Sequence, residues 1–192
     1  MNRLLFCPCC EKEVSYTTET VSETYPVKGE DVVVDSVVSF CSVCGNEIWN
    51  EENDAQTVRK ALDLYRQKHG LLLPQRIKEI REKYGVSQSI FARALGLGEK
   101  TITRYEGGSL QDRAHNGLIA LAEKPDAFHH LVALNKELLS DGELKTLQEK
   151  ISAFQVQVIT TSPKNATIQY SYRDPYKVNT SNYYWGGLSD AG

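Results

Sequence analysis

Two pairs of cysteines constrain the fold of this chain more than any other feature of its sequence. Cys7 and Cys10 form one CxxC pair, Cys41 and Cys44 form a second, and 30 residues separate the two pairs. Each pair can supply two thiolates from one tight turn, so that the two pairs together can surround one metal ion tetrahedrally. Four thiolates leave no open coordination position for water or substrate, and the metal is therefore expected to be structural.

The sequence predicts one zinc ion per chain at this site, and rubredoxin-like iron is the alternative that uses the same ligands. Disulfides and a redox CxxC fit less well, because a reducing cytosol disfavours disulfides and no thioredoxin-like βαβ pattern surrounds either pair. The fifth cysteine, Cys9, is expected to be a non-ligand, although its place beside Cys10 leaves an exchange of ligands open.

The residues around the cysteine pairs predict two strands followed by a helix. Residues 32–40 are rich in β-branched side chains, and residues 14–25 can pair with them across a turn near residues 26–29. After the second cysteine pair, Asn53 is the expected N-cap of a helix. The expected apolar face of that helix consists of Val58, Ala61, Leu62 and Tyr65.

From residue 74 onward the pattern is almost purely helical and is punctuated by glycine and proline. It predicts six short helices, roughly at residues 75–84, 88–95, 99–106, 112–123, 126–139 and 142–154.

Within this region, residues 88–106 have the spacing that the two crossed helices of a helix-turn-helix require. Ala92 is small where the second helix must pack close, Gly96 provides the turn, and Ile102 is placed to anchor the second helix in the core. Ser87 is a good cap for the first helix. Because these features fall in register, the sequence predicts a DNA-binding motif.

From Gln75 to about Leu121 the chain resembles the Xre or lambdoid-repressor class of helix-turn-helix proteins. The resemblance implies a buried ion pair between Arg81 in the first helix and Glu106 at the end of the recognition helix. It also implies that one side of the recognition helix faces the major groove, where Arg104 is suited to bidentate contact with guanine. The expected DNA-binding residues are Gln88, Glu99, Lys100, Thr101, Thr103 and Arg104.

Together the two modules resemble the MqsA-type antitoxins, which carry a YgiT-like zinc finger, over residues 1 to about 135. The cysteine spacing and the ending Arg104-Tyr105-Glu106 carry this resemblance. It implies a homodimer that binds a palindromic operator in double-stranded DNA, represses its own operon and neutralises a toxin protein bound by the zinc domain. Lys100 stands where those antitoxins tend to have asparagine, so the operator sequence is expected to differ.

The whole pattern predicts an α+β protein in four parts. A small β-rich zinc-binding domain occupies residues 1–52, and a helix and linker occupy residues 53–73. An all-α helix-turn-helix domain for DNA binding and dimerisation follows at residues 74–154, and a C-terminal extension at residues 155–192. The extension holds a strand-like pair and an aromatic cluster, which can form an interface or cover the protein's own core.

Charge is divided unevenly along the chain. Residues 1–65 carry 5 Lys and Arg and 12 Asp and Glu, a net charge of −7, whereas residues 66–106 carry 9 and 4, a net charge of +5. DNA phosphates would repel the first segment and attract the second. We therefore expect DNA at the basic segment and a different partner at the acidic one.

Several classes of function are not expected. The histidines His69, His115, His129 and His130 have no nucleophile or carboxylate at a convincing spacing, which argues against an enzyme. The sequence has no apolar run long enough for a membrane span and no secretory signal, so a cytoplasmic protein with no membrane partner is expected. The main hypothesis is an antitoxin and repressor. The alternative is a phage or mobile-element regulator or adaptor whose protein partner is not a toxin.

Overall fold

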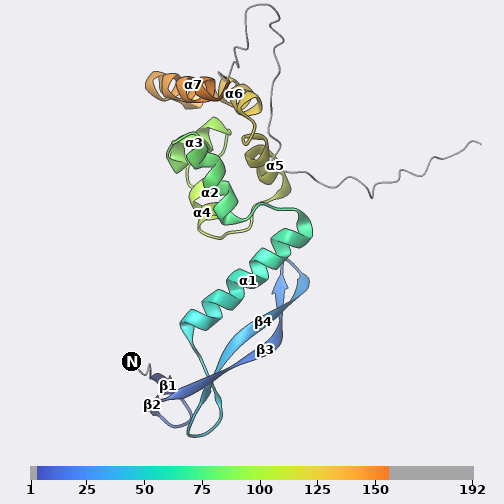
Figure 1. Ribbon diagram of the computed structural model, residues 1–192, viewed down its shortest axis with the longest axis vertical. Helices are drawn as coiled ribbons and strands as arrows, with labels where there is room; N and C mark the ends of the chain where they lie inside the picture. The colour runs from blue at the N-terminus through green and yellow to red at the C-terminus, as the bar shows by residue number, and fades with distance from the viewer. Residues whose placement is uncertain (1–3, 156–192) are drawn as a thin grey trace, which may run out of the picture. The chain divides into compact units, whose positions relative to one another are not determined.

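The computed structural model describes residues 4–155 and has the expected α+β fold, with strands first and helices after them (Figure 1). The strands are β1 (Leu5–Cys7), β2 (Lys12–Val14), β3 (Tyr16–Val27), β4 (Glu30–Cys41) and β5 (Glu47–Ile48). The helices are α1 (Glu51–His69), α2 (Pro74–Lys83), α3 (Gln88–Ala94), α4 (Thr101–Glu106), α5 (Arg113–Leu121), α6 (Pro125–Leu134) and α7 (Asp141–Gln155), with a 3-10 turn η1 (Lys136–Leu138) before α7. The strand-like pair and aromatic cluster predicted for the C-terminal extension lie outside the described residues.

The longest strands form the predicted hairpin. β3 and β4 are antiparallel and in register from Tyr16 opposite Cys41 to Val27 opposite Glu30. The two-residue turn between them, Lys28 and Gly29, has φ angles of 49° and 83°. Two successive positive φ angles are typical of the turn that matches the right-handed twist of a hairpin. A short second ladder joins β1 to β2, and β5 pairs with the end of β4.

Helix α1 packs against β4, but two details of the predicted helix were wrong. Its N-cap is Asn50, whose side chain accepts a hydrogen bond from the backbone N–H of Asn53 at 3.4 Å. The predicted cap therefore lies one turn inside the helix. Its buried face runs through Thr57, Ala61 and Tyr65, which stand at every fourth position over the valines of β4, whereas Val58 is 45% exposed.

The helices from α2 onward enclose one apolar core. Phe91 on α3, Ile102 on α4, Ile119 on α5 and Phe128 on α6 are all fully buried in it. α7 belongs to the same core, because its residues Leu147 and Ile151 are fully buried as well. Among the helices of residues 4–155, none is both long enough and apolar enough to cross a lipid bilayer.

Candidate metal centre and nucleic-acid interface

The four predicted ligand cysteines lie together at the ends of the short strands. Cys7 ends β1 and Cys41 ends β4, while Cys10 and Cys44 lie in the turns that follow. Their sulfur atoms are all within 4.8 Å of one another, and Cys9, which is exposed, is not part of the cluster. The Sγ–Sγ distance is 3.6 Å between Cys7 and Cys44 and 3.9 Å between Cys10 and Cys41.

These separations fit a tetrahedral thiolate site. Four sulfurs about 2.3 Å from one central zinc would be separated from each other by roughly 3.8 Å. Both measured Sγ–Sγ distances lie close to that edge length, and all four donor atoms are of the type that zinc prefers. The cluster can therefore hold a metal ion, with Cys7, Cys10, Cys41 and Cys44 as its ligands.

Backbone geometry prepares Cys41 to act as a ligand. The N–H groups of Val43 and Cys44 point at its Sγ atom over 3.3 and 3.4 Å. The hydrogen bond from the Cys44 N–H has the larger effect, and together the two bonds lower the pKa of Cys41 to about 6. They therefore favour the thiolate form of Cys41. Hydrogen bonding with Cys44 and burial raise the pKa of Cys10 to about 12. Thiols this close cannot all ionise, because the thiolates would repel one another. A metal cation bound between them removes this repulsion.

The segment predicted to be a helix-turn-helix, residues 88–106, contains the two helices α3 and α4. The Ser87 side chain caps α3 by accepting a hydrogen bond from the backbone N–H of Ile90, as predicted. Ala92 and Ile102 are fully buried where the two helices meet. Gly96 has a φ of 71°, and a Cβ atom there would lie 2.7 Å from Oδ1 of Asn135. Glycine is therefore favoured at this turn by the backbone, and a larger residue would also require the Asn135 side chain to shift.

A network of polar side chains fixes α4 against α2 and α3. Arg81 donates from Nε and Nη2 to the two carboxylate oxygens of Glu106, over 2.6 and 2.9 Å. The side chains of this pair are only 12% and 6% exposed. Gln88 donates to Glu106 over 2.7 Å, and the Thr103 hydroxyl donates to the amide oxygen of Gln88 over 2.8 Å. The structure thus brings the expected ion pair together and adds Gln88 to it.

The residues expected to contact DNA differ in their exposure to solvent and in the hydrogen bonds that they already make within the protein. Glu99, Lys100, Thr103 and Arg104 are exposed, and Thr101 is half-buried. Ile102 and Tyr105 face the core on the opposite side of α4. The amide of Gln88 already bonds to two protein side chains, so it is positioned more tightly than its place at a helix N-terminus suggests.

Sequence reasoning missed Arg66, which is almost fully buried near the end of α1. Its Nη2 donates to the carbonyl oxygens of Gly108 and Ser109, over 2.5 and 3.2 Å, and its Nη1 pairs with Asp63 over 2.7 Å. α1 is thereby attached to the loop that follows α4. In the sequence Arg66 looked like one of several cations in the last turn of a helix, and no local pattern distinguishes it from Lys68.

Comparison with known proteins identifies the family of this chain. No match to the chain was found among curated proteins. A family model described as the antitoxin component of a bacterial toxin-antitoxin system, MqsA, matches residues 5–134. The match covers the cysteine cluster, α1 and the helices as far as the end of α6. This chain therefore belongs to the MqsA family of antitoxins.

Proposed function

We propose that this antitoxin is also a DNA-binding repressor, which acts as a homodimer on a palindromic operator of its own operon. The observation that carries the proposal is the anchored recognition helix. The buried pair of Arg81 and Glu106 holds α4 from one side, while Thr103 and Arg104 face solvent on the other. A rigid helix with an exposed arginine and threonine can enter the major groove and contact base edges.

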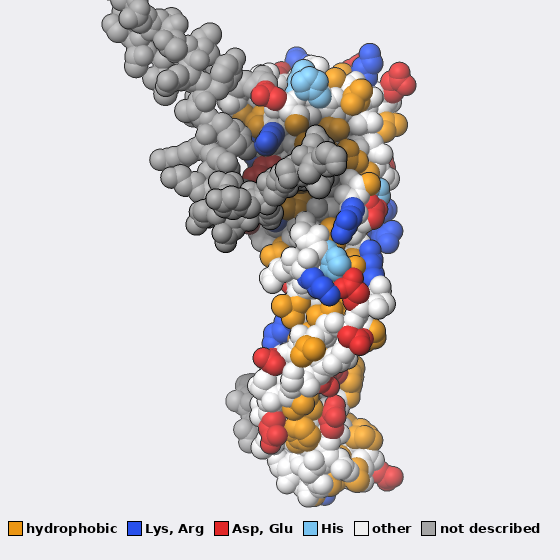
Figure 2. All heavy atoms as spheres, turned by 90° about the vertical axis from the view of Figure 1, so that its right-hand side faces the viewer, with side chains coloured by type: hydrophobic (Ala, Val, Ile, Leu, Met, Phe, Trp, Pro, Cys, Tyr) orange, Lys and Arg blue, Asp and Glu red, His pale blue; other side chains and the backbone are white. Residues whose placement is uncertain are grey.

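The distribution of charge supports DNA contact through the helical region rather than through the strands. On the face drawn in Figure 2, Lys and Arg side chains gather over the helices, and Asp and Glu side chains are the more frequent charges toward the strand end. This agrees with the net charges of −7 for residues 1–65 and +5 for residues 66–106. Phosphates would favour the basic region.

The four-cysteine cluster has a supporting role in this function. We propose that it binds one structural zinc ion through Cys7, Cys10, Cys41 and Cys44. A closed tetrathiolate site supplies folding energy and offers no position at which substrate could react. Its task is to hold the N-terminal strands in a shape that a toxin partner recognises.

A gel-shift titration tests the DNA-binding proposal. Arg104→Ala removes the guanidinium suited to contact a guanine, and should weaken binding to the upstream operator about 5- to 150-fold at a stated salt concentration. The matched control is Arg59→Ala, which removes the same charge from an exposed position on α1. Binding to a scrambled duplex should change much less than operator binding. Equal operator affinities for the wild type, Arg104→Ala and Arg59→Ala would contradict recognition through α4.

The toxin partner is tested from the operon. The neighbouring open reading frame should encode a small, basic protein that arrests growth when expressed alone. Co-expression with this antitoxin should restore growth, and the two proteins should purify as a complex. A neighbouring protein that neither arrests growth nor binds this chain would favour the alternative regulator.

A further inference from the structure

The loop that follows α4 is held by residues of α1 and of the linker between α1 and α2. The loop residues 108–111 lead from α4 toward α5, and their partners include Arg66 and Leu72. These contacts involve neither the cysteine cluster nor the residues expected to contact DNA. Because the loop begins where α4 ends, contacts to it also act on the end of the proposed recognition helix.

Arg66 makes two hydrogen bonds to this loop from the last turn of α1. Its Nη2 donates to the carbonyl oxygens of Gly108 and Ser109. The Arg66 side chain is 1% exposed, whereas Asp63, with which it pairs, is 44% exposed. A guanidinium buried this deeply has lost its hydration, and the two carbonyl groups and Asp63 replace part of it. Arg66 is therefore fixed against the loop.

The loop peptides that Arg66 binds are also the peptides that end α4. The backbone N–H of Ser109 donates to the carbonyl oxygen of Arg104 over 2.9 Å, and that of Gly108 donates to Tyr105 over 3.1 Å. With a φ of 104° at Gly108, this is the hydrogen-bond pattern of a Schellman motif at a helix C-terminus. Gly108 and Ser109 thus donate to α4 and accept from Arg66. Arg66 extends the network of hydrogen bonds that ends α4.

The rest of the loop is attached to the same part of the chain. Leu110 packs against the apolar cluster between the β3–β4 hairpin and α1. Gln111, which is 1% exposed, donates from Nε2 to the carbonyl oxygen of Leu72 over 2.6 Å. Asn116 on α5 accepts a hydrogen bond from the N–H of Leu72 over 2.8 Å. Side chains that follow α4 in the sequence therefore satisfy both backbone groups of Leu72.

We propose that Arg66 is a positioning residue for operator recognition, which fixes the C-terminal end of α4 and with it the direction of Arg104. Operator affinity then depends on α1, a helix outside the helix-turn-helix. Bidentate contact with a base tolerates little change in distance or angle, so a loosened last turn of α4 weakens base contact. This inference rests on the proposed DNA binding and identifies a residue that controls its strength.

Gel-shift titration of the full-length, zinc-loaded protein tests the proposal. Arg66→Gln removes both bonds to the loop, and should weaken operator binding by about 5-fold or more without exceeding the effect of Arg104→Ala. Arg66→Lys keeps the charge but loses the planar guanidinium, and should give an intermediate affinity. The matched control is Lys68→Gln, which removes the same charge from the same turn at a 62% exposed side chain. It should leave operator affinity nearly unchanged.

A double-mutant cycle separates positioning from other roles of Arg66. If Arg66 acts through Arg104, Arg66→Gln should have little further effect in an Arg104→Ala protein. Binding to a scrambled duplex should not change, because Arg66→Gln removes no phosphate contact. Effects that simply add in the double variant, or an equal loss on operator and scrambled duplex, would show that Arg66 does not act by positioning Arg104 and would overturn the proposal.

Amide hydrogen exchange measured by nuclear magnetic resonance without DNA provides an independent readout. In Arg66→Gln the N–H of Ser109 should exchange faster, because its loop has lost the contact with α1. The N–H of Ile119, in the middle of α5, should keep its rate if the core stays folded. An unchanged rate at Ser109 in the folded variant would contradict the proposal. If Arg66→Gln does not fold, exchange and operator affinity are compared in Arg66→Lys, and wild-type values of both overturn the proposal.

Failure of the inference and failure of the proposed DNA binding have different signatures. If Arg104→Ala binds the operator as well as the wild type does, recognition through α4 fails and the inference fails with it. If Arg104→Ala weakens binding while Arg66→Gln and Arg66→Lys keep wild-type affinity, DNA binding through α4 stands and positioning by Arg66 is wrong.

Discussion

The Arg81–Glu106 pair joins α4 to α2 through two hydrogen bonds. Glu106 ends α4 and accepts hydrogen bonds from both Arg81 and Gln88, so that α2, α3 and α4 meet at one carboxylate. The hydrogen bond to Glu106 raises the pKa of Arg81, which keeps the guanidinium charged. Two charges this deeply buried are tolerated only because each satisfies the other.

Removing the charge of Glu106 should therefore destabilise the helical domain. We expect Glu106→Gln to lower the free energy of unfolding by about 3–5 kcal/mol, because Arg81 would be left buried without its counter-charge. Thermal unfolding followed by circular dichroism measures this as a lower Tm. Glu99→Gln is the control, since Glu99 is 61% exposed and its contact with Arg93 is 3.7 Å long. An unchanged Tm for Glu106→Gln would mean that this pair does not stabilise the fold.

At the level of elements, glycine, proline and capping residues made most helix positions predictable. Ser87 and Pro125 mark the starts of α3 and α6, and Gly96 marks the turn between α3 and α4. The start of α1 was predicted one turn late because two asparagines stand three residues apart and either can cap a helix. Asn50 and Asn53 both donate hydrogen bonds to the Ser39 hydroxyl on β4, a residue distant in sequence, so local sequence does not indicate which of the two is the cap.

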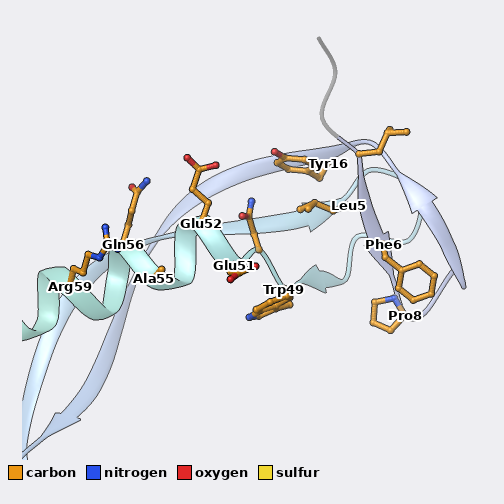
Figure 3. Close-up of a pocket in the computed structure, with 12 residues that line it drawn as sticks. Leu5, Phe6, Pro8, Tyr16, Trp49, Glu51, Glu52, Ala55, Gln56 and Arg59 are labelled. Atoms are coloured by element: carbon orange, nitrogen blue, oxygen red, sulfur yellow. The ribbon is translucent and has the colours of Figure 1, made fainter. Parts of the chain in front are cut away.

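The candidate sites were also predictable to different degrees, depending on how far apart in the sequence their residues lie. The cysteine cluster and the face of α4 depend on local spacing, which the sequence contains. A groove of about 1010 Å³ beside the cluster, shown in Figure 3, joins residues from Leu4 to Arg59 that become neighbours only after folding. Nothing in the order of the residues indicates that Phe6 and Trp49 share one surface, or that Arg66 reaches the backbone after α4.

α7 extends the fold beyond the part of the chain that matches the antitoxin family. The match ends at residue 134, yet Leu147 and Ile151 are fully buried in the helical core, and Arg93 on α3 pairs with Glu143 on α7 over 2.6 Å. The packed side chains make α7 an integral part of this core. The sequence predicted a helix at residues 142–154 and included it in the helical domain of residues 74–154.

Truncation of α7 side chains should consequently destabilise the helical domain. Ile151→Ala would leave a cavity in the core, at a cost of about 2–5 kcal/mol in the free energy of unfolding. Gln148→Ala, which changes an exposed position on the same helix, should leave stability nearly unchanged. Urea unfolding of both variants measures the difference. If Ile151→Ala and Gln148→Ala had the same free energy of unfolding, the packing of α7 would not stabilise the helical core.

At the level of the whole molecule, the described residues bury three separate apolar clusters. The first contains Cys7, Val14, Cys41 and Ile48 around the metal site. The second lies between the hairpin and α1 and contains Val27, Val32, Val34, Ala61 and Tyr65. The third is the core of the helices from α2 to α7. Only the first of these clusters includes the cysteines, so only that part of the fold depends directly on the metal.

Removing the metal should therefore separate the two proposed binding functions. In the first cluster, four thiols without a cation cannot all be ionised, and the apolar residues around them are too few to hold β1, β2 and β5 in place. We expect a chelator, or Cys41→Ser, to disorder these strands and with them Phe6 and Trp49. The second and third clusters contain no ligand residue, so α1 and the helical domain should stay folded.

The consequence for function is that a zinc-free protein should lose toxin binding and keep operator binding. Nuclear magnetic resonance spectra should show loss of dispersed signals from residues 4–14 and 44–49, while the helical circular dichroism signal and its melting transition persist. Gel shifts on the same sample should give operator affinity close to that of the zinc-loaded protein. Cys9→Ser is the control, because Cys9 is exposed and outside the cluster, and it should change neither zinc content nor either binding function. If chelation abolished operator binding together with toxin binding, the metal site would have to stabilise the helical domain as well, and the independence of the three clusters would be wrong.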